Sequence, residues 1–268
     1  MKKLIAAILL IGSTPFVGLA QDSFTPEEAA FNRVLIVPYH PNYYISDSDG
    51  EMADFSQMDA REMRKIFRQD LDAYVSAAVK QNYDAEQILI NESDDAQADL
   101  RALYSAVSYR YDTTSSYLRL NKERTQRVKI NDIKKRFQDK LMRRGEFNPM
   151  ATKEKDEVSL EFLDAKIRDQ ETITNLTQKY RADLIVFVNQ LEVKINYNNC
   201  IDLANKVYNR EFKMHFSVYT AQGEKVFGDV VTTIFPSDSN DLEMITRNNF
   251  PLMAAYLIKN LPGGAPRN

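Results

Sequence analysis

Apolar and polar residues alternate strictly in one stretch of the chain, from Phe212 to Tyr219. The even-numbered positions hold Phe, Met, Phe and Val, and the odd-numbered positions hold Lys, His, Ser and Tyr. A period of two predicts a strand with one apolar, buried face and one polar face. We therefore expect Phe216→Asp to destabilise the fold strongly and His215→Ser to cost little.

Two more strands are predicted on either side of this segment. Residues Leu184 to Val188 are apolar without alternation, which is typical of a strand covered on both faces. The short loop from Ala221 to Glu224 contains a glycine and leads into a strand that ends at Phe235. The last two strands should therefore form a hairpin.

The rest of the chain predicts an α/β fold. Apolar runs predict strands at 32–38 and 87–91, and a weakly alternating run predicts another at 158–166. Helical spacing predicts helices at 58–81, 93–109 and 169–180, and a last helical region that begins at 238, with Pro251 in a helix first turn. The expected fold is a mixed sheet packed by helices, with a C-terminal hairpin and helix and a basic helical insertion at 112–150.

The N-terminal residues have the pattern of a secretory signal peptide. Two lysines precede an apolar run from Leu4 to Ile11, and Gly18 and Ala20 are small residues at the −3 and −1 positions of a cleavage site. Gln21 follows where bacterial lipoproteins carry a lipidated cysteine. We expect a cleaved signal at 1–20, a lead-in at 21–32, one domain at 33–262 and a tail at 263–268. The predicted location is the periplasm of a Gram-negative bacterium, without lipid attachment.

Composition is ordinary for a globular protein, with 44% hydrophobic and 27% charged residues. Removal of residues 1–20, which hold two lysines and no acid, takes the formal net charge from −3 to −5. This mild acidity argues against nucleic acid as a general partner. No later segment reaches the roughly 20 apolar residues of a membrane span. Cys200 is the single cysteine, so no intrachain disulfide is possible.

Positive charge gathers in one segment of this acidic chain. Between Lys122 and Arg144 there are ten Lys/Arg and three Asp/Glu residues, and apolar residues recur there at helical spacing. The segment predicts either a solvated helix face or a docking surface for an acidic partner, which is an envelope protein or the anionic membrane surface. The basic residues of this candidate docking surface are Lys134, Lys135, Arg136, Lys140, Arg143 and Arg144.

No complete catalytic or metal-binding motif is present in the sequence. The two histidines, His40 and His215, are far apart, and there is no His-Glu-x-x-His, no cysteine pair and no Gly-x-Ser-x-Gly. The run Asp47–Glu51 is rich in acids, but its register as a calcium loop places Ile45 and Ser56 at the first and twelfth positions, where the loop needs carboxylate ligands. We therefore expect no catalytic residue, no metal and no cofactor.

The loop at 39–51 is the stronger candidate for binding. It follows the carboxyl end of the first predicted strand, where open α/β sheets bind ligands. Its rings and acceptors suit sugars, peptides or a protein partner, unless the aromatic residues fold back onto the sheet. The candidate residues are Tyr39, His40, Tyr43, Tyr44, Asp47 and Asp49.

Three passages resemble a small α/β domain that is common in bacterial envelopes. Arg33–Pro38 is similar to its opening strand, Lys179–Val188 to its passage of helix, Ala-Asp and buried strand, and Phe212–Phe235 to its closing hairpin. The domain occurs at the amino terminus of the translocation protein TolB, in the curli secretion channel subunit and in lipoprotein activators of penicillin-binding proteins. The resemblance covers about half of the chain after residue 20. It implies a non-enzymatic envelope protein whose sheet or loops dock partners.

The function expected from the sequence is non-catalytic. The protein should dock to or modulate an assembly of the cell envelope. The alternatives are an enzyme that acts on cell-wall or carbohydrate material, and a periplasmic solute-binding protein. Two acids that converge in a deep cleft would favour the enzyme, and two similar lobes would favour a hinged solute-binding protein.

Overall fold

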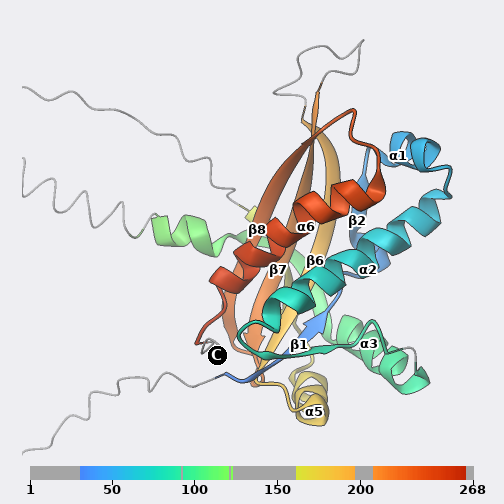
Figure 1. Ribbon diagram of the computed structural model, residues 1–268. Coiled ribbons are helices and arrows are strands. Elements are labelled where there is room, and N and C mark those ends of the chain that lie inside the picture. The colour runs from blue at the N-terminus through green and yellow to red at the C-terminus, as the bar shows by residue number, and fades with distance from the viewer. Residues whose placement is uncertain (1–30, 92, 121, 123–160, 197–207, 264–268) are drawn as a thin grey trace, which may run out of the picture.

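Six strands of the described chain form one mixed sheet (Figure 1). The computed structural model describes residues 31–91, 93–120, 122, 161–196 and 208–263. The strands of this sheet are β1 (Arg33–Val37), β2 (Tyr44–Ser46), β3 (Asp84–Gln87), β6 (Leu184–Asn196), β7 (Asn209–Thr220) and β8 (Lys225–Pro236). Their order is β3-β1-β6-β7-β8, with β2 also paired to β6. Strand β1 is parallel to β3 and β6, and β7 is antiparallel to β6 and β8, which confirms the mixed α/β fold and the hairpin.

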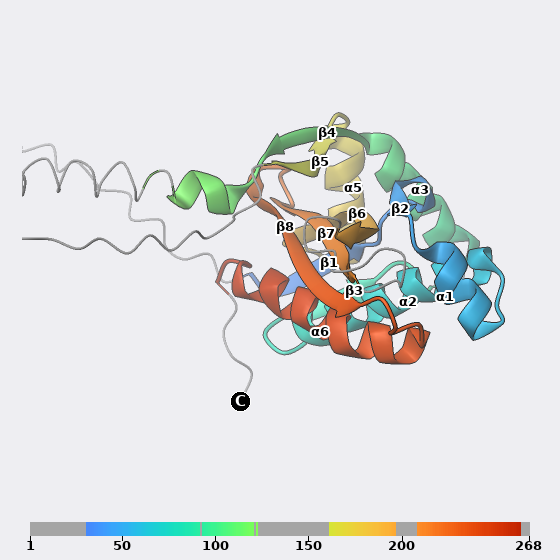
Figure 2. The same cartoon turned by 90° about the horizontal axis from the view of Figure 1, so that it is seen from above.

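Helices cover both faces of the sheet (Figure 2). They are α1 (Asp49–Ser56), α2 (Ala60–Val79), α3 (Asp94–Ala106), α5 (Gln170–Tyr180) and α6 (Leu242–Lys259), with a short 3-10 turn, η1 (Pro41–Tyr43). Helices α2 and α6 lie on one side of the sheet, and α3 and α5 lie on the other. This arrangement explains why the start of β6 is apolar without alternation. Among the described helices, none has the length and apolar character that a membrane span requires.

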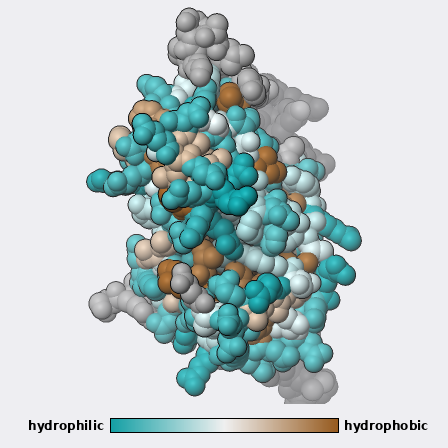
Figure 3. Space-filling model, turned by 90° about the vertical axis from the view of Figure 1, so that its right-hand side faces the viewer, coloured by the Kyte–Doolittle hydropathy of each residue, from teal (hydrophilic) through white to brown (hydrophobic). Residues whose placement is uncertain are grey.

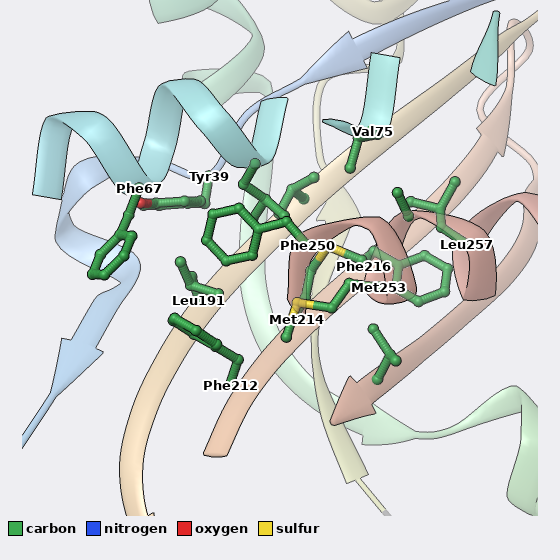
Figure 4. Packing of buried hydrophobic residues seen from close by; sticks show 14 of the residues in the cluster. Tyr39, Phe67, Val75, Leu191, Phe212, Met214, Phe216, Phe250, Met253 and Leu257 are labelled. Atoms are coloured by element: carbon green, nitrogen blue, oxygen red, sulfur yellow. The ribbon is translucent and has the colours of Figure 1, made fainter. Parts of the chain in front are cut away.

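The larger core lies between the sheet and helices α2 and α6 (Figure 4). The apolar residues of β7 from Phe212 to Val218 are all buried there, as the alternation predicts. Three rings from three different elements meet at its centre. The ring centroids of Phe212 and Phe250 are 5.2 Å apart, and Phe67 lies 5.6 Å from Phe212 and 6.1 Å from Phe250. Edge contacts of this kind add to the apolar burial that holds the helices on the sheet.

The second face of β7 is also covered, and this corrects the expectation for His215. A separate antiparallel ribbon of β4 (Val107–Thr113) and β5 (Glu161–Ile167) lies over it. His215 is only 4% exposed, and its Nδ1 accepts a hydrogen bond of 2.9 Å from the backbone N–H of Leu163. His215→Ser would leave a buried backbone donor without its acceptor, so the substitution should destabilise the fold rather than cost little.

Several element boundaries differ from the predicted ones. Strands β2 and β4 and helix α1 were not predicted, because each is short or lacks a clear apolar period. Pro251 lies inside α6 and not in its first turn, which makes that prediction wrong. Buried residues Phe250 and Met253 flank the proline, so burial of the helix outweighs the loss of one backbone hydrogen bond.

The buried carboxyl of Asp72 on α2 should make stability depend on pH. Burial raises the pKa of Asp72 to about 6, and within the described chain only one of its oxygens has a partner, the Gln87 amide at 3.0 Å. Between about pH 4 and pH 6 the unfolded chain ionises this group while the folded chain keeps it protonated. The free energy of unfolding should therefore fall with rising pH by about 3 kcal/mol over this range.

Urea titrations between pH 4 and pH 7 measure this effect. Asp72→Asn should remove the fall, and Asp70→Asn, at a half-exposed position of the same helix, should leave it in place. An unchanged pH profile in the Asp72 variant would contradict the assignment.

Candidate functional site

A cleft lies beside the carboxyl end of β1, between the segment that follows this strand and the first half of α2. Its volume is about 640 Å³, within the range of small-molecule sites. Helix α2 starts next to it because the Asp59 side chain caps the helix by accepting from Arg61 N at 2.9 Å. The described lining residues are Tyr39, Pro41, Asn42, Tyr44, Arg61, Arg64, Lys65, Arg68, Gln69, Leu89 and Gln97. Four of them are cationic, and none is an acid.

Two of the six predicted loop residues line this cleft. Tyr39 and Tyr44 have ring centroids 6.4 Å apart and nearly parallel planes. Burial raises the pKa of both phenols far above the ordinary value, so both remain protonated donors. The Tyr44 hydroxyl donates to Asp49 at 2.6 Å. The Tyr39 hydroxyl is buried and has no hydrogen-bond partner in the described chain.

The other four predicted residues contact other parts of the fold, and Asp47 is exposed. His40 packs against Tyr104 with ring centroids 4.9 Å apart, and Tyr43 packs against Tyr109 at 4.1 Å. The carboxylate of Asp47 accepts from Ile195 N at 3.0 Å. The carboxylate of Asp49 accepts from Arg64 Nε at 2.7 Å.

These contacts place His40 and Tyr43 against α3 and β4. Binding by the six residues as a set stays a prediction, and Tyr39 and Tyr44 are the two that the fold brings to the cleft.

Four basic residues of α2 line the same cleft, and no local sequence pattern connects them with the loop. They occupy one helical face at spacings of three, one and three residues: Arg61, Arg64, Lys65 and Arg68. Their spacing was visible in the sequence, but the position of the loop across from them depends on the packing of α2 against β1. Figure 3 shows the side of the molecule on which α1, α2 and α3 lie, and most of this surface is hydrophilic.

Two of these arginines are held in place by hydrogen bonds through Nε. Arg68 Nε donates to Tyr39 O at 2.8 Å, and its Nη2 donates to the Tyr104 hydroxyl at 2.8 Å. Tyr104 in turn donates to Pro38 O at 2.8 Å, and burial raises its pKa to about 12. Arg64 is bonded to Asp49 and lies over the Tyr44 ring, 5.5 Å from its centroid. The hydrogen bond to Asp49 raises the pKa of Arg64.

The basic residues predicted as a docking surface, from Lys134 to Arg144, lie outside the described residues, as does Cys200. In the part of the chain that is described, no group of three or more His, Cys, Asp or Glu side chains is arranged to hold a metal ion.

Comparison of the chain with protein-family models, with curated proteins and with solved structures finds no match. The resemblance to the envelope domain therefore stays a prediction. The class that the fold itself defines is an α/β protein with a cationic, aromatic cleft at the carboxyl end of its first strand.

Proposed function

We propose that this protein is a non-catalytic component of the bacterial cell envelope that docks to or modulates an assembly there. It recognises an anionic group of its partner in the cleft between the 39–44 segment and α2. The observation that carries the proposal is the lining of this cleft, which combines four cationic side chains with two tyrosines. Such a lining suits the holding of an anion, since arginine and aromatic residues dominate the energetics of recognition sites.

The position of the cleft supports a binding role. It lies where a strand of an open α/β sheet ends and the chain turns outward, which is the usual place for ligands in this architecture. Arg64 and Arg68 are fixed by hydrogen bonds before any ligand arrives, so little side-chain entropy is lost on binding.

The envelope location rests on the sequence. The pattern of residues 1–20 is that of a secretory signal peptide, and Gln21 in place of cysteine favours a protein free in the periplasm. The partner is an envelope protein or an envelope component at the membrane surface, with negative charge at its contact.

Neutralisation of Arg61 and Lys65, two exposed cations of the cleft, should weaken partner capture. Arg61 and Lys65 are exposed and have no acidic partner in the described chain, so Arg61→Gln with Lys65→Gln should leave the fold intact. Capture of partners from an envelope extract should fall about tenfold, since rim charges accelerate and stabilise association. The wild-type protein should itself lose capture between about 0.05 M and 0.5 M salt, because added salt screens exposed charges.

A matched control is available on α6. Arg247→Gln with Lys259→Gln removes the same charge from two exposed residues of α6, which contributes no residue to the described cleft lining, and should keep capture at the wild-type level. Equal losses in both double variants would mean that only net charge matters, and the cleft would no longer be the docking site.

A further inference from the structure

We propose that the anionic group held in the cleft is a phosphate ester attached to an organic group. The inference rests on the proposed function only in taking the cleft as a binding site. It adds the chemical class of the ligand, which follows from three features of the lining: two oriented guanidinium groups, an excess of positive charge, and a buried hydroxyl without a partner.

The guanidinium groups of Arg64 and Arg68 are one helical turn apart and are both held through Nε. Asp49 accepts from Arg64 Nε at 2.7 Å, and the carbonyl of Tyr39 accepts from Arg68 Nε at 2.8 Å. Within the described chain, Arg64 bonds through Nε alone and Arg68 through Nε and Nη2, so both Nη nitrogens of Arg64 and Nη1 of Arg68 remain available to a ligand. Two planar forks with free N–H groups, fixed in orientation, are the geometry that binds several oxygens of one oxyanion.

The charge in the cleft exceeds what a single carboxylate would neutralise. Four cationic side chains line it, and Asp49 is the one acid bonded to any of them in the described chain. A phosphate monoester carries about −1.5 to −2 near neutral pH and offers three acceptor oxygens, whereas a carboxylate carries one charge and two oxygens. The excess of cations therefore favours the phosphate.

Tyr39 supplies the third feature. Its side chain is 2% exposed, it lines the cleft, and its hydroxyl has no partner in the described chain. An unpaired buried hydroxyl destabilises the fold, and a phosphate oxygen would accept its hydrogen bond. The ring of Tyr44, with Pro41 and Leu89, provides apolar surface for the organic group that carries the phosphate.

Calorimetric titration of the protein with phenyl phosphate tests the inference directly. Benzoate carries the same ring on a carboxylate, and inorganic phosphate lacks the ring. Phenyl phosphate should bind at one site, about tenfold or more tighter than either comparison compound. Vesicles that contain phosphatidic acid form a second arm. Binding of phenyl phosphate identifies a free phosphate ester as a sufficient ligand, and binding of the vesicles alone identifies a lipid headgroup.

Two variants connect the binding to the cleft. Arg68→Lys keeps the charge but removes the planar guanidinium group with its several N–H donors, and affinity for phenyl phosphate should fall about tenfold. Tyr39→Phe removes only the hydroxyl, so affinity should fall several-fold while the melting temperature stays the same or rises. The control Arg247→Gln should bind as the wild type does.

The results separate this inference from the proposed function. If benzoate bound as tightly as phenyl phosphate, the assignment of a phosphate ester as the ligand would be wrong, and the cleft would remain a binding site. Tyr39→Phe with a lower melting temperature and unchanged affinity would also overturn it, since the hydroxyl would then be structural. If neither phosphate probe binds, while capture from envelope extract still depends on Arg61 and Lys65, the ligand class is wrong and the docking proposal stands.

Discussion

Phe216→Asp is expected to abolish cooperative folding. Phe216 has no exposed surface and lies in the core between β7 and α6, with ring centroids 5.9 Å from Phe227 and 6.2 Å from Tyr256. The substitution removes a buried aromatic ring and places an unpaired carboxylate among apolar side chains. The combined loss should exceed about 5 kcal/mol, which is comparable with the whole stability of a typical domain. Thermal unfolding followed by circular dichroism should show no cooperative transition.

Val226→Asp is the matched control for this substitution. Val226 is on β8, in the same hairpin, and is 37% exposed, so the new carboxylate stays hydrated. Its cost should remain within about 1 kcal/mol. Similar melting temperatures for the two variants would show that the assignment of the buried face is wrong.

Asp164→Ala is expected to detach the β4–β5 ribbon from the main sheet. Asp164 is fully buried on β5, and its carboxylate accepts from Lys225 Nζ at 2.7 Å and from the Tyr219 hydroxyl at 3.3 Å. It also accepts a short hydrogen bond from Ser217. Removal of the carboxylate leaves the buried Ser217 and Tyr219 hydroxyls without this acceptor, whereas Lys225 keeps its hydrogen bond to Asp112 at 3.2 Å. The cost should be about 3 to 5 kcal/mol in denaturant unfolding.

Hydrogen exchange distinguishes a loss of stability that is confined to the ribbon from a loss that affects the whole fold. In Asp164→Ala, the backbone amides of β5 should exchange faster while those of β6 remain protected, because β6 is held by β1 and β7. Asp164→Asn keeps an acceptor oxygen and should recover part of the stability. If the alanine variant is as stable as the wild type and its β5 amides are equally protected, Asp164 does not hold the ribbon.

Local sequence determined the elements that have a strong period. The alternation from Phe212 to Val218 identified the face of β7 that is buried against α6, and the continuous apolar run from Leu184 identified a strand covered on both sides. Helices α2, α3 and α5 were predicted to within a few residues because their apolar stripes repeat over several turns. Strand β3 lies at Asp84–Gln87, earlier than the apolar run at 87–91 from which it was predicted.

The polar face of β7 is buried, and the alternation of apolar and polar residues could not predict this. The alternation is the same whether a polar face meets water or a second polar layer. His215 and Ser217 are buried because β5, about 50 residues away in sequence, supplies a backbone N–H and the carboxylate of Asp164. Arg210 is fully buried for the same kind of reason, since it pairs with Glu51 and with the Asn240 side chain at 2.7 Å.

For the candidate site too, some features were visible in the sequence and others depended on the tertiary structure. The sequence by itself determined that an aromatic loop follows the first strand and that a helix with several basic residues comes after it. Only the tertiary structure decided that this face meets Tyr39 and Tyr44 in one cleft, while His40 and Tyr43 turn toward Tyr104 and Tyr109. A local pattern reports which side of an element avoids water. The partner that each side meets is set by packing between segments that are distant in the chain.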